Sequence, residues 1–419
     1  MPAPLCEDGA VPTDEPPARG RLARAVRAAT PLDWIRLALL AAGIVCVLTG
    51  ALPRAEAEAN LRRIAPLLAF LAAIIVLAKL TKEARVFDVL AARMAIAGRG
   101  SYPALFGLSV LLASSLTMFL NLDTTAVLLT PVLLALAAQT GIAAPPLAMT
   151  TVWLANTASL LLPVSNLTNL LAADRVALPP AAFAARMWLP QLVAVAVTAL
   201  FLWLFFWRRK ARGKDAYVPP APPAIDSPKR FWAASIACLG FVIALFAGVE
   251  IAIAAGVAAA VVVAAFAVNG GRAHLRPSLI PWQLLIFVTG LFLVVPTLAR
   301  HGLADVMAAL IGSDGGLIGA FRAAFTGAGL SNALNNLPAY TAGETVVPAQ
   351  NQTQLLALLI GTNVGPVVTM WGSLATLLWY ESCRIYGVRV EKRRFALTGA
   401  VCALIAIAGS VPALLVTGQ

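Results

Sequence analysis

The 419-residue chain is 60% hydrophobic and only 12% charged, whereas about a quarter of the residues in a typical soluble domain carry a charge. Apolar runs of about 18 to 20 residues recur along the chain, and this length crosses the hydrocarbon core of a bilayer. The composition excludes a soluble globular protein. The net charge of +12 lies in short clusters between apolar runs and not on a basic face, so it gives no support to nucleic-acid binding.

Residues 1–33 form a polar tail that we expect in the cytoplasm. Residues 34–207 are interpreted as a first membrane repeat, with an interrupted apolar region at 103–143. Its predicted spans are 34–52, 64–80, 147–172 and 187–207. Residues 208–230 are charged and then proline-rich, which predicts a cytoplasmic linker.

Residues 231–419 are interpreted as a second membrane repeat that carries one extra span, with an interrupted apolar region at 316–353. Its predicted spans are 231–249, 251–268, 281–299, 354–379 and 395–415. The extra span, 231–249, inverts the second repeat relative to the first. Inverted repeats with interrupted helices in matching positions indicate a secondary transporter with its site near the bilayer midplane.

The two interrupted regions break at NLDTT (121–125) and at SNALNNLP (331–338). Each is interpreted as a re-entrant hairpin of two short helices, and the alternative is a pair of ordinary helices with polar kinks. The predicted fold class is therefore an all-α polytopic membrane protein of two inverted repeats, each with a re-entrant hairpin and a broken transmembrane helix.

The distribution of positive charge predicts the orientation of the chain. We assume that the N-terminus is cytoplasmic and that each hairpin returns to the membrane side from which it enters. Of the 31 Lys and Arg residues, 24 then lie on the cytoplasmic side. Cytoplasmic loops of membrane proteins carry such an excess. We expect a multi-pass protein of the cell inner (plasma) membrane.

Four polar stretches lie at membrane depth: the two hairpin turns, NTASLLLPVSNLTN (156–169) and GTNVGPVVTMWGSLAT (361–376). Irregular backbone is tolerated at that depth only where it is buried in protein or lines a wet cavity. The candidate residues for binding substrate or ions are Asn121, Thr124, Thr125, Asn156, Ser165, Asn166, Thr168, Asn169, Ser331, Asn332, Asn335, Asn336, Thr362, Asn363, Thr369 and Ser373. The alternative is that single Ser and Thr side chains bond to their own helix backbone or hold neighbouring helices together.

Asp123 is the carboxylate within these stretches, and an ionisable residue in a membrane is a functional hypothesis by default. We expect it to couple protons to transport and to share one cavity with Asn166, Asn336 and Asn363. The alternative is an ionised cap for a half-helix that begins at Thr124.

The four stretches contain no Lys or Arg, which favours a neutral substrate or one bound by amide dipoles. Arg322 lies on the arm of the second hairpin and could still approach the polar stretches. Glu344 is expected to be solvated at the outer surface.

No catalytic, metal or cofactor site is predicted. The five cysteines are widely spaced without a C-x-x-C pair, and the two histidines lie far apart in sequence. A membrane enzyme or receptor is an alternative of another class, but the sequence offers no nucleophile–base pair, phosphate loop or sensor domain for it.

Five stretches resemble signatures of arsenite/antimonite efflux permeases in the ion-transporter superfamily, and they occur in the family's order. In chain order they are DTTAVLLTPVLLAL, TASLLLPVSNLTNLLAAD, PWQLLIFVTGLFLVV, NNLP and GSLATLLW. The similarity runs from about residue 64 to the C-terminus. It implies metalloid export in exchange for protons, with an elevator-like movement of the hairpin domain. It also suggests a homodimer and, as in some relatives, a docked soluble ATPase.

Two positions depart from the family pattern. The chain has Asn363-Val364-Gly365-Pro366-Val367 where the family commonly has Asp-Leu-Gly-Pro-Lys, and NLDTT where the family has Asn-Asp-Gly-Ala. The alternative function is therefore a sodium-coupled carrier of dicarboxylates, citrate or sulfate, as in other branches of the superfamily. Sodium dependence would separate the two.

Overall fold

The computed structural model describes residues 31–208, 216–221 and 223–418. Nearly all of the predicted tail and part of the predicted linker lie outside this range. Within the described residues every regular element is helical, and eight helices are long and apolar enough to cross a bilayer. The prediction of an all-α polytopic membrane fold is confirmed.

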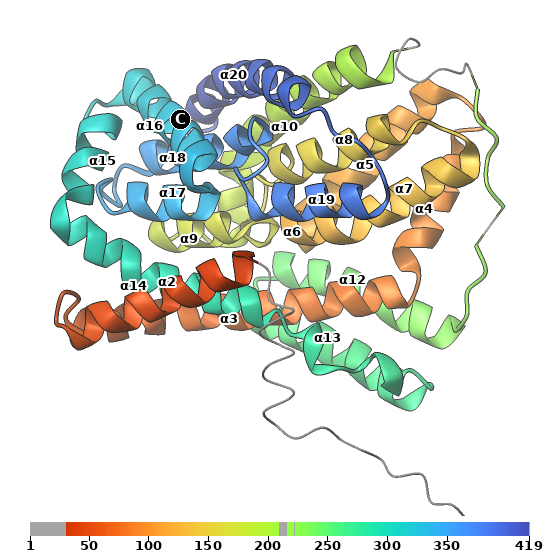
Figure 1. Ribbon diagram of the computed structural model, residues 1–419, viewed down its shortest axis with the longest axis horizontal. Helices are drawn as coiled ribbons and strands as arrows, with labels where there is room; N and C mark the ends of the chain where they lie inside the picture. Colours follow the sequence, from red (N-terminus) through yellow and green to blue (C-terminus); the bar gives the residue numbers. More distant parts are fainter. Residues whose placement is uncertain (1–30, 209–215, 222, 419) are drawn as a thin grey trace, which may run out of the picture.

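The helices form two layers (Figure 1). We call the first the scaffold layer, and it contains α2 (Pro31–Leu48), α3 (Arg54–Glu83), α12 (Pro228–Phe246), α13 (Ile251–Val268) and α14 (Trp282–Leu298). Gly43 and Gly290 bring α2 and α14 together: a Cβ at Gly290 would lie 2.7 Å from the backbone nitrogen of Leu40. In lipid the hydrophobic effect does not drive helices together, so helix association depends on the close packing that small residues allow.

The second layer, which we call the hairpin layer, holds the polar stretches. The first half contributes α5 (Tyr102–Leu120), α6 (Leu122–Thr124), the π-helical turn η1 (Thr125–Leu129), α7 (Thr130–Thr140), α8 (Ala144–Thr157), the 3₁₀ turn η2 (Pro163–Ser165), α9 (Leu167–Arg175) and α10 (Pro180–Leu202), which continues as η3 (Trp203–Trp207). The second half contributes α16 (Gly316–Leu334), α17 (Asn336–Glu344), α18 (Gln352–Val364), the turn η7 (Gly365–Val367), α19 (Leu374–Ile385) and α20 (Lys392–Val416). Both predicted hairpins and both predicted helix breaks are therefore present.

Shorter elements join the layers. The sequence did not predict α4 (Val86–Ala97) or α15 (Ala304–Ile311), which follows the irregular turn η6 (Ala299–Leu303). Two 3₁₀ turns, η4 (Arg272–His274) and η5 (Pro277–Leu279), lead from α13 into α14. Tyr217 of the predicted linker donates a hydrogen bond of 2.6 Å from its hydroxyl to the carbonyl of Ala95, which fixes this part of the linker on α4.

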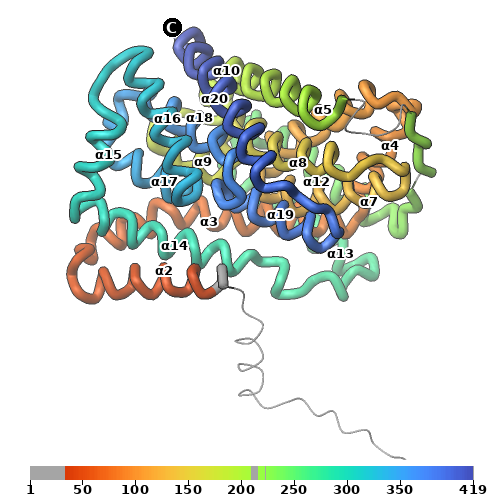
Figure 2. The backbone as a smooth tube through the Cα atoms, turned by 45° about the horizontal axis from the view of Figure 1, so that its top comes forward, coloured from red at the N-terminus to blue at the C-terminus, as the bar shows by residue number. Residues whose placement is uncertain are grey.

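The second hairpin packs against α18 through small residues, and Figure 2 shows these segments side by side. A Cβ at Gly361 would lie 1.9 Å from the carbonyl oxygen of Ala324, and one at Gly327 would lie 2.8 Å from that of Leu358. Both positions must therefore be glycine for the two helix backbones to touch. The contact places the hairpin turn beside the break after α18.

Candidate polar site and cavity

The two broken helices meet at a buried cluster of amides. Oδ1 of Asn363, in the last turn of α18, accepts hydrogen bonds from Nδ2 of Asn166 (3.0 Å) and Oγ1 of Thr168 (2.8 Å). Its Nδ2 donates to Oδ1 of Asn169 at 2.7 Å. Asn169 in turn donates from Nδ2 to the carbonyls of Ser159 and Leu162 in the extended break, at 2.6 and 2.9 Å. The cluster therefore supplies partners to backbone groups that the break leaves without helical bonds.

A second buried contact joins the same two helices. Nδ2 of Asn156, at the end of α8, donates to Oγ1 of Thr376 at 3.1 Å. Ser373 begins α19, and its hydroxyl lies 2.9 Å from the same Thr376 oxygen. The Oδ1 atom of Asn156 is buried without a partner among the described residues. These side chains fix the spacing between the first and second halves of the hairpin layer.

The two hairpin turns have matching backbone conformations. Asn121 has φ 105° and ψ 148°, and Asn335 has φ 115° and ψ 154°, a region rarely occupied by residues other than glycine. In each case the side-chain oxygen accepts a hydrogen bond from the backbone N–H two residues later, at 2.8 Å for Asp123 and 3.4 Å for Leu337. Each turn therefore begins its second helix with an asparagine cap.

The second hairpin turn binds the backbone of the second break. Oδ1 of Asn332 accepts hydrogen bonds of 2.9 Å from both the N–H and the hydroxyl of Thr369. Nδ2 of Asn332 donates to the carbonyl of Gly365 at 2.8 Å. The amide of Asn335 and the backbone N–H of Asn336 bond to the carbonyls of Trp371 and Gly372. This turn is therefore held to the stretch that leads into α19.

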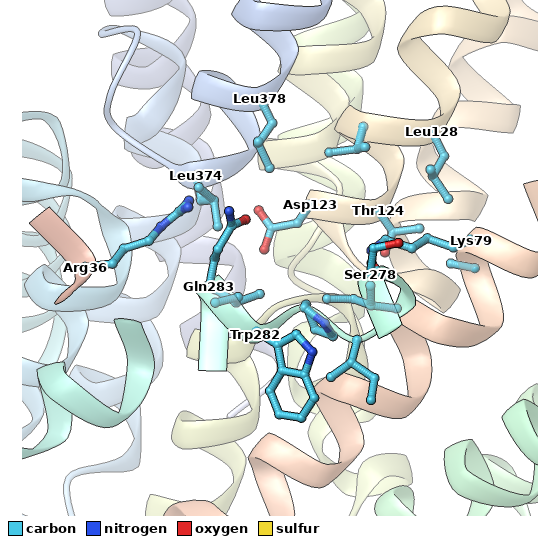
Figure 3. A pocket seen from close by; sticks show the side chains of 16 residues that line it. Arg36, Lys79, Asp123, Thr124, Leu128, Ser278, Trp282, Gln283, Leu374 and Leu378 are labelled. Carbon is cyan, nitrogen blue, oxygen red and sulfur yellow. The ribbon is translucent and has the colours of Figure 1, made fainter. Parts of the chain in front are cut away.

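A cavity of about 400 Å³ separates the first hairpin turn from the scaffold layer (Figure 3). The hairpin layer contributes Asp123 and Thr124, together with Leu374 and Leu378 of α19. The scaffold layer contributes Arg36 of α2, Ile75, Ala78 and Lys79 of α3, Ser278 of η5, and Trp282 and Gln283 of α14. Among the described residues, the Asp123 carboxylate has no hydrogen-bond or ion-pair partner, and Figure 3 shows it beside the Gln283 amide. The cavity thus exposes one acid to a mostly apolar space.

The structure corrects one prediction and one alternative hypothesis about the Asp123 cavity. Asn166, Asn336 and Asn363 do not line the Asp123 cavity, because the first and third bond to each other and the second binds Gly372. Asp123 is not the cap of its helix: the helix begins at Leu122 and Asn121 caps it.

The prediction of a solvated Glu344 is also wrong, and Arg322 does not line the cavity. Arg322 forms an exposed ion pair with Asp314, away from the cavity. Glu344 is buried and not solvated, because it pairs with Arg63 of the scaffold layer.

Four of the candidate hydroxyl groups bond only to backbone carbonyls among the described residues, as the alternative interpretation of such groups predicts. The acceptors are Asn121 for Thr125, Met118 for Ser165, Ala328 for Ser331 and Leu359 for Thr362. These side chains join or stabilise helix ends in this conformation.

The sequence reading missed the scaffold side of the cavity. Lys79 lies at the end of the predicted span 64–80 and donates from Nζ to the carbonyls of Ser278 (2.7 Å) and Leu279 (3.1 Å). Arg36 and Gln283 sit near the starts of their spans, where a polar residue reads as an interfacial anchor. The cavity therefore includes cations that the four polar stretches lack.

No metal centre is found within the part of the chain that the structure describes, which holds no group of three or more His, Cys, Asp or Glu residues arranged to bind an ion. Of the described cysteines, Cys383 and Cys402 are buried and Cys46 and Cys238 are half-buried. The polar groups of the site are amides, hydroxyls, the Asp123 carboxylate and the cations Arg36 and Lys79.

The chain is similar to known membrane transport proteins. Residues 28–361 match the family described as citrate transporter (CitMHS). Over 328 residues the chain is 31% identical to the arsenical pump membrane protein of Yersinia enterocolitica and 32% identical to one from Escherichia coli. Each match covers 73% of this chain and 76% of the relative. The chain belongs to the arsenical pump membrane protein family of the ion-transporter superfamily.

The fold also matches a solved structure. It is similar to the Alcanivorax borkumensis YdaH transporter, with a TM-score of 0.55 and 16% identity, over 92% of this chain and 97% of that chain. The family members are transporters, and the eight apolar helices fit a multi-pass membrane protein. The chain is therefore a membrane transporter.

Proposed function

We propose that the chain exports arsenite or antimonite in exchange for protons, with Asp123 as the residue that binds the proton. The single observation that carries the proposal is the position of its carboxylate. It stands at a hairpin turn, faces a cavity and has no partner among the described residues. The identity to arsenical pump membrane proteins supports the cargo.

The proposed mechanism is competition at Asp123. The ionised carboxylate accepts hydrogen bonds from the hydroxyl groups of a trihydroxide such as arsenite, while the apolar walls suit an uncharged molecule. Protonation removes acceptor capacity from the carboxylate and favours release of the cargo. A carrier that holds either cargo or a proton at the same group exchanges one for the other.

The proposed direction follows from the charge distribution. The cavity lies at the Lys79 end of α3 and at the N-terminal ends of α2 and α14, and the excess of Lys and Arg supports a cytoplasmic location for these ends. A neighbouring cavity that shares Lys79 and Leu128 continues past Lys82, His274 and Arg276. We therefore interpret the conformation as open to the cytoplasm.

We further propose that residues 34–207 and 231–419 are inverted repeats. The repeated order of hairpin and broken helix supports this, as do the matching backbone angles of Asn121 and Asn335. The homodimer and the docked ATPase remain predictions from the family resemblance.

The test is tolerance of a host that lacks its own metalloid exporters. Expression of this chain should raise the arsenite or antimonite concentration at which the host still grows. The competing proposal is a sodium-coupled dicarboxylate, citrate or sulfate carrier, favoured by the citrate-transporter match and by Arg36 and Lys79 in the cavity. Unchanged tolerance together with sodium-driven citrate uptake would establish that alternative.

A further inference from the structure

A second charged cluster lies at the other end of α3. Arg63 precedes Lys79 by 16 residues, about 24 Å along the helix axis at 1.5 Å per residue. Its Nε donates to Oδ2 of Asp174 in α9 at 2.7 Å, and its Nη1 donates to Oε1 of Glu344 in α17 at 3.3 Å. One scaffold arginine thus holds two carboxylates, one from each half of the hairpin layer.

The Arg63–Glu344 contact is more buried than an ordinary surface ion pair, whereas Asp174 is half exposed. The Glu344 side chain is only 7% exposed, and the described residues offer it no cation in hydrogen-bond contact except Arg63. Four atoms here are buried and have no partner within the described part of the chain: Glu344 Oε2, Arg63 Nη2, Arg175 Nε and the hydroxyl of Tyr340. Removing one member of a buried pair leaves an uncompensated charge, so such a contact strongly favours the conformation in which it forms.

The hairpin-layer members of the cluster are tied to one another independently of the scaffold. Arg175 Nη2 donates to the carbonyl of Val347, and Gln352 Nε2 donates to the carbonyl of Val176, at 3.4 and 3.2 Å. The end of α9 and the segment after α17 therefore form one unit. The Arg63 contacts are the ones in this cluster that cross between the layers.

We propose that Arg63 and Glu344 close the external end of the transport pathway, and that breaking their ion pair is required for the pathway to open outward. The inference rests on the proposed cytoplasmic orientation and on alternating access by movement of one bundle against another. With the Asp123 cavity open at the Lys79 end, the opposite end must be closed. Arg63, Asp174 and Glu344 are the charged groups that join the layers there. They are positioning residues and do not contact the cargo.

The test measures access to the cavity from each side without any cargo. Val127 lines both the Asp123 cavity and its neighbour, so Val127→Cys serves as the reporter in a variant whose five native cysteines are replaced by alanine. A membrane-impermeant maleimide should label it faster in everted vesicles than in right-side-out vesicles. Adding Glu344→Gln should raise the rate of labelling from the external side about tenfold. This corresponds to a contribution of about 1.4 kcal/mol by the ion pair to the externally closed state.

The matched control is Glu56→Gln. Glu56 pairs with Arg300 at 2.8 Å, but this pair connects α3 with η6, which directly continues α14 of the scaffold layer. The Glu56→Gln change should therefore leave labelling from the external side unchanged. Arg63→Gln also releases Asp174, so it should raise external labelling at least as much as Glu344→Gln does. Adding Glu344→Gln to it should have little further effect, because the Arg63–Glu344 pair is already lost.

Three results would overturn the proposal. They are unchanged external labelling in both Glu344→Gln and Arg63→Gln, an equal rise in Glu56→Gln, and labelling of the parent reporter from the external side alone. Since no cargo is present, a failed tolerance test would refute the proposed cargo without affecting the labelling result.

Discussion

At the scale of single residues, Asp123 is distinguished by what surrounds it. Asn121 supplies the helix cap, so the carboxylate is left to face the cavity. Asp123→Asn preserves the shape but holds no exchangeable proton. We expect the variant to insert normally and to lose uphill transport driven by a pH gradient. Downhill exchange of substrate should continue at a lower apparent affinity, because the amide keeps one acceptor oxygen but not the carboxylate.

The control for Asp123 is Asp305→Asn, which changes an exposed acid in the first turn of α15 and should transport like the parent. Both variants are compared by substrate accumulation in vesicles at a series of external pH values. Accumulation against a gradient by Asp123→Asn with the pH dependence of the parent would show that another group carries the proton.

Asn363 tests the amide cluster at the same scale. In Asn363→Asp an oxygen replaces the nitrogen that donates to Asn169 Oδ1. Asn169 cannot turn its amide without breaking its two bonds to Ser159 and Leu162. We expect the free energy of unfolding to fall by at least about 1–3 kcal/mol, the cost of a buried unpaired polar group, and by more where the new carboxyl is ionised.

The pH dependence of this loss has a defined sign. Protonation of the introduced carboxyl restores an O–H donor, so the difference in thermal midpoint from the parent should narrow as pH falls. Asn269→Asp is the control, because Asn269 bonds only to the carbonyl of Ala265 at the end of α13. An Asn363→Asp protein with the parent's thermal midpoint at neutral pH would mean that the cluster adds little stability.

At the scale of elements, the hairpin turns depend on an unusual backbone conformation. At Asn121, glycine adopts a φ of 105° without strain but loses the cap, whereas alanine loses the cap and adds strain of about 1–3 kcal/mol. We therefore expect Asn121→Gly to be less destabilised than Asn121→Ala, and the same order at Asn335. Thermal unfolding of the purified variants measures this, and the reverse order would argue against strained turns.

Helix contact makes a separate prediction at this scale. Gly361→Ala places a Cβ against the carbonyl of Ala324 and must push α16 away from α18. Gly329→Ala, in α16 itself, meets nothing within 4 Å and should be neutral or gain up to about 1 kcal/mol from helix propensity. Gly361→Ala should therefore reduce the yield of folded protein, measured by size-exclusion profile in detergent, while Gly329→Ala should not. Equal profiles would contradict the close contact.

At the scale of the whole molecule, the sequence predicted the elements better than their pairing. Span 251–268 coincides with α13, and the turns at NLDTT and SNALNNLP are hairpins, because hydrophobic length and polar breaks are local properties. The partners of those elements are not local. Arg63 and Glu344 are 281 positions apart, and nothing near either residue in sequence indicates the pair.

The same reason explains the candidate site. Residue type predicted that Asn166, Asn169 and Asn363 are polar and buried, but not that they satisfy one another. Lys79 and Gln283 enter the cavity from the scaffold layer, which has no polar motif of its own. Asp123 was predictable because a carboxylate between apolar runs is rare enough to stand out alone.

The most direct measurement of the central claim is flux into everted vesicles. Vesicles that contain this chain are placed in buffer without sodium, with a pH gradient that is acid inside the vesicle. Arsenite, antimonite or citrate is then added outside. We expect arsenite or antimonite to accumulate, the accumulation to collapse when a protonophore removes the gradient, and sodium to have no effect. Citrate accumulation that requires sodium, with no metalloid uptake under any gradient, would contradict the account.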